Sequence, residues 1–184
     1  VTGLTNGTSY NFTVTATNAV GTSSPSTATN SVTPVTNPGA PTSVSAVGGN
    51  GEATITFTAP VSDGGATISY YTVTSNTGVT TYGGSSPITV TGLSNGTTYT
   101  FTVTATNSYG TSTASATSNS VVPATVPDAP TIGTATGGNG QATITFSAPV
   151  SNGGSAITYY TVSSNVGGLT TYGASSPLDV TSLA

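Results

Sequence analysis

The chain contains no lysine, arginine, histidine, cysteine, methionine or tryptophan, and it has four acidic side chains in 184 residues. A protein without cations cannot neutralise phosphates, which argues against nucleic acid and against an anionic membrane surface as partners. No apolar run approaches the ~18 residues that a membrane-spanning helix needs. Salt bridges between side chains cannot form, so the fold must depend on apolar burial and hydrogen bonds.

The same absences remove most of the chemistry of an enzyme, because no His, Cys or Lys is present for acid–base or covalent catalysis. Glu52 and Asp63 fall at opposite ends of one expected strand, roughly 20 Å apart at strand rise, which is too wide for a glycosidase pair. Asp63 or Asp128 could join carbonyl oxygens around calcium, but isolated acids in turns usually stabilise the turn itself. We therefore expect no catalytic residue, no cofactor and no metal.

The absence of cysteine leaves the redox compartment open, because many surface proteins also avoid thiols. The chain has neither an initiator methionine nor a signal peptide. This favours a mature fragment or an internal window of a longer protein.

The chain is built from one repeat. The stretch VTGLTNGTSYNFTVTATN at Val1 returns as VTGLSNGTTYTFTVTATN at Val90, and VTSL begins a third copy at Val180. The offset between copies grows by one residue after Asn76 and Asn165. The four acids do not recur between copies, which is a further argument against a catalytic role.

Each copy alternates apolar residues with threonine at period two, as a half-buried strand does. Tyr99, Phe101, Val103 and Ala105 point one way, and the intervening threonines point the other. A one-residue slip would bury the threonines, so the register is strongly set. No window has helical spacing, and the pattern predicts an all-β sandwich. The expected strands are 42–47, 52–59, 68–75, 80–83, 87–93, 98–107 and 118–123.

The pattern L-x-N-G-T-x-Y-x-F-x-V-x-A-x-N, which ends in Gly110, resembles the strand E to strand F region of fibronectin type III domains in bacterial tandem arrays. The resemblance implies tandem immunoglobulin-like β-sandwiches of seven strands each. It also implies that Tyr10 and Tyr99 form the tyrosine corner, with their hydroxyls bonded to nearby backbone. Phe57 and Phe146 stand where the family usually has a strand B tryptophan, so an aromatic side chain still fills that site.

The resemblance also implies three parts. Residues 38–123 form a complete domain, residues 1–34 supply the end of strand E with strands F and G, and residues 127–184 supply strands A to E. The chain is either a window on a long array or a protomer whose incomplete ends complement each other between copies. In both cases we expect a linear string of sandwiches, joined by short proline-containing linkers that favour a semi-rigid rod.

Five tyrosines are predicted to face outward. Tyr70 and Tyr159 are on one strand of each copy, Tyr82 and Tyr172 are on the next, and Tyr109 is in the F–G loop. The four strand tyrosines could stack a sugar or a neighbouring chain, or they could pack locally over the sheet edge. Tyr109 is a separate possible surface contact in its loop. Sequons for N-linked sugar begin at Asn6, Asn11 and Asn95.

These observations favour a structural and adhesive repeat of an extracellular or cell-surface microbial stalk or filament. Its expected partner is itself, by end-to-end association, with strand complementation between chains as one route and with glycans as second partners. The alternative is a spacer or weak carbohydrate-binding module of a secreted polysaccharide hydrolase. We expect no enzyme activity and no membrane insertion in this segment.

Overall fold

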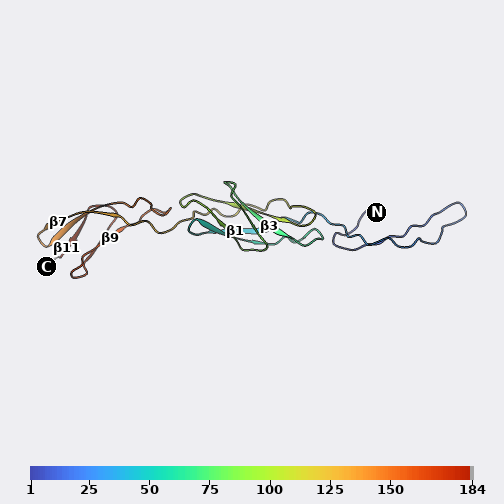
Figure 1. Ribbon diagram of the computed structural model, residues 1–184, viewed down its shortest axis with the longest axis horizontal. Coiled ribbons are helices and arrows are strands. Elements are labelled where there is room, and N and C mark those ends of the chain that lie inside the picture. Colours follow the sequence, from blue (N-terminus) through green and yellow to red (C-terminus); the bar gives the residue numbers. More distant parts are fainter. Residues whose placement is uncertain (183–184) are drawn as a thin grey trace. The chain divides into compact units, whose positions relative to one another are not determined.

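The computed structural model describes residues 1–182, and these residues form strands, turns and loops without a helix (Figure 1). Within this range no helix is long and apolar enough to cross a membrane. The chain forms two compact units. The first comprises Val1–Val47, Thr54–Val90 and Tyr99–Ser120; the second comprises Gly48–Ala53, Thr91–Thr98 and the chain from Val121 onward.

Residues 38–123, called the middle sandwich below, contain six strands in two sheets of three. One sheet has the order β1-β2-β5, made of β1 (Thr42–Gly48), β2 (Glu52–Thr58) and β5 (Ile88–Thr91). The other has the order β4-β3-β6, made of β3 (Tyr70–Ser75), β4 (Thr80–Gly83) and β6 (Phe101–Thr106). The strands of the second sheet pair antiparallel.

The core of the middle sandwich follows the predicted alternation. In β6, Phe101 and Val103 are 1% and 0% exposed, whereas the intervening threonines are half-buried. Ile55 of β2 and Val73 of β3 are also fully buried. Burial of each such side chain contributes about 1.5–3 kcal/mol. The same core holds Ala46, Ala53, Phe57, Tyr71, Ile88, Val90, Leu93, Tyr99 and Ala105.

The prediction of a seventh strand at 118–123 is wrong, because no regular strand follows β6 in the middle sandwich. Instead, a serine at every third position bonds to every second residue of β6. Each serine N–H donates to a β6 carbonyl, and its Oγ accepts the N–H of the same β6 residue. The pairs are Ser112–Ala105, Ser115–Val103 and Ser118–Phe101, with all six distances between 2.8 and 3.0 Å. Three residues of the serine segment therefore span the same length as two residues of β6, and a regular β ladder cannot form.

Residues 1–34, the N-terminal segment, form the same ladder without any regular strand. The pairs are Ser23–Ala16, Ser26–Val14 and Thr29–Phe12. Tyr10 and Val32 close the hairpin with two backbone hydrogen bonds of 2.9 and 2.8 Å. Each ladder hydroxyl also donates to the carbonyl of the next residue, which satisfies its own hydrogen.

The described part of the C-terminal segment, residues 127–182, contains five strands in two sheets. The first has the order β11-β8-β7, made of β7 (Thr131–Gly138), β8 (Gln141–Ser147) and β11 (Leu178–Thr181). The second pairs only β9 (Tyr160–Ser163) with β10 (Thr170–Gly173). These strands correspond in order to β1–β5 of the middle sandwich, and the counterpart of β6 is absent from residues 127–182.

Candidate functional site

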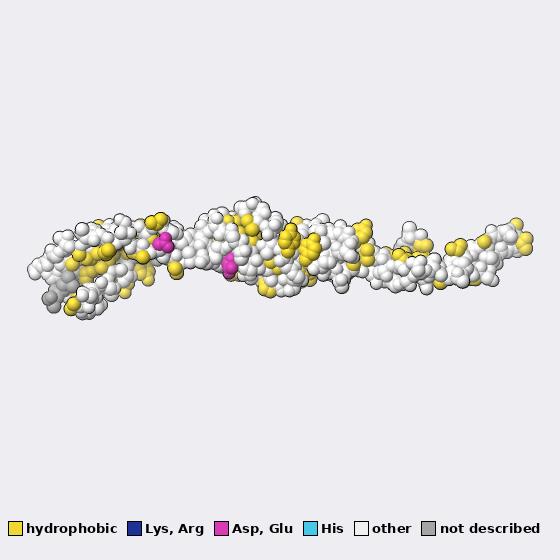
Figure 2. Space-filling model, viewed as in Figure 1, with side chains coloured by type: hydrophobic (Ala, Val, Ile, Leu, Met, Phe, Trp, Pro, Cys, Tyr) yellow, Lys and Arg dark blue, Asp and Glu magenta, His cyan; other side chains and the backbone are white. Residues whose placement is uncertain are grey.

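The acidic side chains serve turns and strands rather than a shared centre. Asp63 Oδ1 accepts the backbone N–H of Gly65 at 2.8 Å, the usual role of aspartate in a turn. Asp179 accepts the hydroxyl of Thr143 at 2.6 Å across two neighbouring strands. Within residues 1–182 no three Asp, Glu, His or Cys side chains gather as a metal site would require. Figure 2 shows a mostly uncharged surface with isolated acidic side chains on the visible face.

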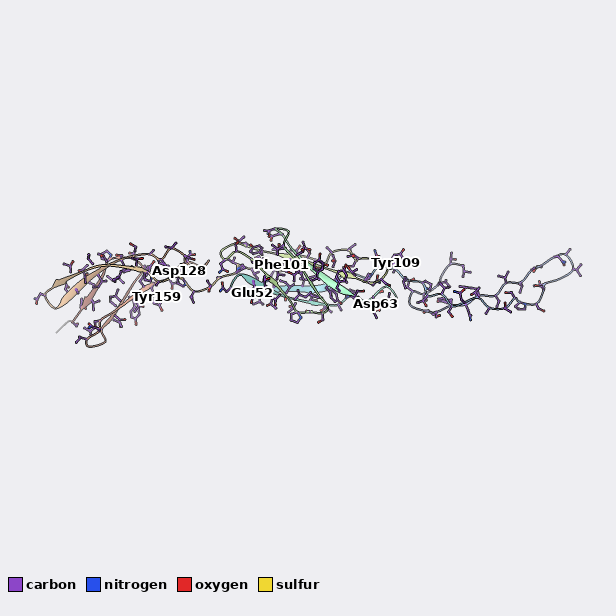
Figure 3. The ribbon with its side chains drawn as sticks, in the orientation of Figure 1. Glu52, Asp63, Phe101, Tyr109, Asp128 and Tyr159 are labelled. Atoms are coloured by element: carbon purple, nitrogen blue, oxygen red, sulfur yellow. The ribbon has the colours of Figure 1, made fainter. Side chains whose placement is uncertain are left out.

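The outward tyrosines form one pair in each copy of the repeat. The ring centroids of Tyr70 and Tyr82 are 5.9 Å apart in an edge-to-face arrangement, and those of Tyr159 and Tyr172 are also 5.9 Å apart. Each pair therefore packs locally and still leaves surface open, since the four side chains are 39–67% exposed. Tyr109, labelled in Figure 3, is 62% exposed in the loop after β6 and belongs to neither pair.

Tyr10 and Tyr99 lie where the chain enters the strand of the ladder. The Tyr10 hydroxyl accepts the Thr5 backbone N–H at 2.9 Å, and this hydrogen bond lowers the pKa of the phenol. Tyr99 is 5% exposed, and its ring lies beside that of Phe101 with a centroid distance of 6.3 Å. Tyr99 thus lies in the core just before β6, whereas the Tyr10 hydroxyl joins the hairpin to the preceding turn.

The three sequons differ in how accessible their amides are. Asn95 Oδ1 accepts the N–H of Gly51 at 2.8 Å, and its Nδ2 donates to Asn50 Oδ1 at 2.8 Å, so this amide has a structural role. Asn6 and Asn11 are exposed. The sequence predicts Asn6 and Asn95 in equivalent turns, as plausible acceptors, and Asn11 in a strand. It does not predict the engaged amide of Asn95, because the partners of this amide are far away along the chain.

The N-terminal segment exposes residues whose counterparts form the core of the middle sandwich. Val14 is 71% exposed, whereas its counterpart Val103 is 0% exposed. Phe12 is half-buried, and its ring lies beside Tyr10 at 6.4 Å between centroids. The hairpin thus presents an apolar row along one face.

The C-terminal segment has a matching uncovered face. The rings of Phe146 and Tyr160 pack at 4.7 Å between centroids, as Phe57 and Tyr71 do in the middle sandwich. Ile132 beside them is 72% exposed. A hollow of about 70 Å³ opens on this face and is lined by Pro130, Ile132, Phe146, Tyr160, Thr161 and Val162. Figure 2 shows hydrophobic side chains gathered in this segment.

Both segments also have a free strand edge. In the middle sandwich β3 pairs with β4 on one side and β6 on the other, whereas β9 pairs with β10 alone among the described strands. In the N-terminal hairpin the backbone groups of Thr13 and Thr15 make no hydrogen bond to any described residue. Unpaired edges of this kind are sites for adding another strand.

Comparison with known proteins supports the fold. No curated protein sequence matches the chain. Domains d3–d4 of the rat CD45 extracellular region match with a TM-score of 0.52 at 16% identity, over 66% of this chain and 67% of that chain. Domains A168–A170 of titin match with a TM-score of 0.45 at 29% identity, over 48% of this chain and 32% of that chain. The chain thus spans about a third of the titin structure.

One family accounts for the central part of the chain. Residues 38–121 match the family described as "Fibronectin type III domain". The same residues contain the two sheets and the buried alternating core described above. Residues 38–121 therefore have the all-β, immunoglobulin-like sandwich fold of the family that they match.

Proposed function

We propose that the chain is a structural and adhesive segment of an extracellular or cell-surface filament, and that its copies join end to end. In the joint, the N-terminal hairpin of one copy covers the C-terminal segment of another copy. Each joint then completes a sandwich like the one at residues 38–123. The fibronectin type III fold itself serves many roles, so the proposal depends on these surfaces rather than on the fold.

The single observation that carries the proposal is the pair of matching uncovered faces. The N-terminal segment exposes Val14 and its apolar row, and the C-terminal segment exposes Ile132 beside Phe146. The sequence of the hairpin strand, FTVTATN, is identical in residues 12–18 and 101–107. Because residues 101–107 cover the equivalent face in the middle sandwich, the hairpin is a suitable cover for the C-terminal segment.

The surface composition supports growth by association. The chain has no lysine or arginine, so its strand edges lack the lysines that commonly discourage pairing between molecules. The lack of these residues also removes every trypsin cleavage site, which suits an extracellular setting. Because no ion pair is involved, assembly should change little with salt.

Sedimentation velocity of the purified chain tests the proposal. We expect species much larger than one chain over a range of salt concentrations, and a single small species throughout would contradict it. In a longer array, the unit that follows along the chain would supply the same strands. The intact mass of the native protein, compared with the mass of these 184 residues, distinguishes the two arrangements.

A second candidate function is a carbohydrate-binding module or spacer of a secreted polysaccharide hydrolase. It is favoured by the exposed tyrosine pairs, which have the same 5.9 Å geometry in both copies of the repeat. Aromatic rings of this kind stack on the apolar faces of sugars. Glycan pull-down with Tyr82→Ala and Tyr172→Ala variants tests it, with Tyr109→Ala as the matched control outside the pairs.

A further inference from the structure

We infer the register of the joint: residues 12–17 of the N-terminal hairpin, called the hairpin strand, add antiparallel to β9 of a second copy, with Val14 opposite Val162. The inference rests on the proposed function and specifies which residues meet. The partner is a second copy of this chain, and the contact is a row of backbone hydrogen bonds along one strand edge.

The register follows from the middle sandwich. There β6 pairs antiparallel with β3, and Val103 lies opposite Val73. The repeat offset carries Val103 to Val14 and Val73 to Val162. The same transfer gives the pairs Thr17–Tyr159, Ala16–Tyr160, Thr15–Thr161, Val14–Val162, Thr13–Ser163 and Phe12–Ser164.

The backbone of the hairpin strand is free on the side that this register uses. Phe12, Val14 and Ala16 direct their N–H and C=O groups to the ladder of Ser23, Ser26 and Thr29. In a strand the alternate residues direct theirs to the opposite side. That side carries Thr13 and Thr15, which have no described partner.

The acceptor strand β9 is free on the corresponding side. It pairs with β10 through Tyr160 to Ser163, and no second strand lies beside it among the described residues. Its counterpart β3 carries β6 on that side. One donor edge and one acceptor edge thus match strand for strand.

The side chains select this register over its neighbours. With Val14 opposite Val162, the row of Phe12, Val14 and Ala16 faces the hollow lined by Phe146 and Tyr160. A slip of one residue would turn Thr13 and Thr15 into that hollow and expose the valine. A slip of two would keep the faces but displace the Phe12 ring from the position that Phe101 holds in the middle sandwich.

The hairpin is already ordered before it docks. Its ladder bonds join residues up to 17 apart in sequence, and all of them lie within 1–34. A preformed hairpin loses less conformational freedom on binding than a flexible strand would. This makes the N-terminal segment a suitable donor as it stands.

Disulfide trapping between copies tests the register, because the chain has no native cysteine. One copy carries Thr15→Cys, and a second copy, distinguished by a tag, carries Thr161→Cys. Directly opposite residues have Cα atoms about 4.5–5.5 Å apart, within the range that a disulfide accepts. The matched control replaces the second variant with Ser163→Cys, which lies on the same strand face two residues out of register.

We expect the matched pair to form mixed disulfides more than about tenfold faster than the control, because diagonal neighbours are ~7–8 Å apart. Equal rates, or faster bonding in the control, would overturn the register even if the unmodified chain still assembles. If a chain that carries both Thr15→Cys and Thr161→Cys forms only intramolecular disulfides, the partner is not a second copy and the inference is wrong. Sedimentation of the unmodified chain reports separately on the proposed function.

Discussion

Val103 and Val14 occupy the same place in identical stretches of sequence, yet one is 0% exposed and the other 71% exposed. The alternation of threonine and apolar residues determines which face of the strand is apolar in both places. Whether that face is buried depends on strands that come from elsewhere along the chain. The comparison shows that burial depends on the partner strands as well as on the local sequence.

The aromatic pairs add a second lesson to the same comparison. Phe146 and Tyr160 keep the 4.7 Å centroid distance of Phe57 and Tyr71, although no counterpart of β6 covers them in the described residues. This ring contact between β8 and β9 therefore does not depend on a strand in the place of β6. In the middle sandwich β6 adds Phe101 and Val103 to the core beside this contact, and in the proposed joint the N-terminal hairpin of a second copy would do the same.

A carboxylate at Val14 should have the largest effect, because it places an unpaired charge in the interior of each joint. We expect Val14→Asp to abolish assembly in sedimentation experiments. Thr15→Asp, on the outward face of the same strand, is the matched control and should assemble like the unmodified chain. Filaments formed by Val14→Asp would show that this row is not the contact.

Truncation of the aromatic residue sharpens the difference between the two regions. Phe101→Ala should destabilise the middle sandwich by about 3–5 kcal/mol, because it opens a cavity in a closed core. Phe12→Ala should change the unfolding of the dissociated chain by less than about 0.5 kcal/mol, since its face is open. Denaturant titration below the assembly concentration measures both. Equal losses in the two variants would mean that the hairpin face is covered in the single chain.

The serine ladder allows a smaller test of the same kind. Ser115→Ala leaves the buried N–H of Val103 without its acceptor and should cost about 1–3 kcal/mol. Ser26→Ala should cost less in the dissociated chain, because water can reach the N–H of exposed Val14. Denaturant midpoints compared at equal slope measure the difference. A cost at Ser26 as large as that at Ser115 would argue against solvent access.

The smallest effect concerns pH. Burial raises the pKa of the Tyr71 phenol, which is 6% exposed. Between about pH 10, where the unfolded chain loses this proton, and the higher folded pKa, the folded state binds more protons. Stability of the middle sandwich should therefore fall as pH rises through that window. Tyr71→Phe should reduce this fall in thermal melts at alkaline pH, and an unchanged pH profile would assign the fall to other groups.

Much of the fold could be predicted from period-two alternation. The positions of Phe101, Val103 and Ile55 in the core follow from it directly, because a strand has only two faces. The outward positions of Tyr70 and Tyr159 were predicted in the same way. Their edge-to-face contacts with the next strand were not, since these depend on the pairing of β3 with β4 and of β9 with β10. Whether these rings bind glycans stays a prediction.

The departures from the predicted structure have physical reasons too. The segment 112–118 carries serine at every third position, and the serine hydroxyls accept the N–H groups of β6 in place of backbone carbonyls. A search for alternation at period two does not detect this arrangement. The engaged amide of Asn95 depends on Gly51 and Asn50, which are distant along the sequence. Contacts of this kind depend on the tertiary fold and are not encoded in any short stretch.

The three-for-two spacing of the hydroxyl ladder has a consequence for growth. On its outer flank, the amides and carbonyls of this segment fall out of step with the repeat of an extended strand. A neighbouring molecule that approaches this flank therefore meets no regular template for hydrogen bonding, although the segment 112–118 carries no charged side chain to repel it. In a filament of the proposed kind, this flank should therefore contribute little to pairing between neighbouring filaments.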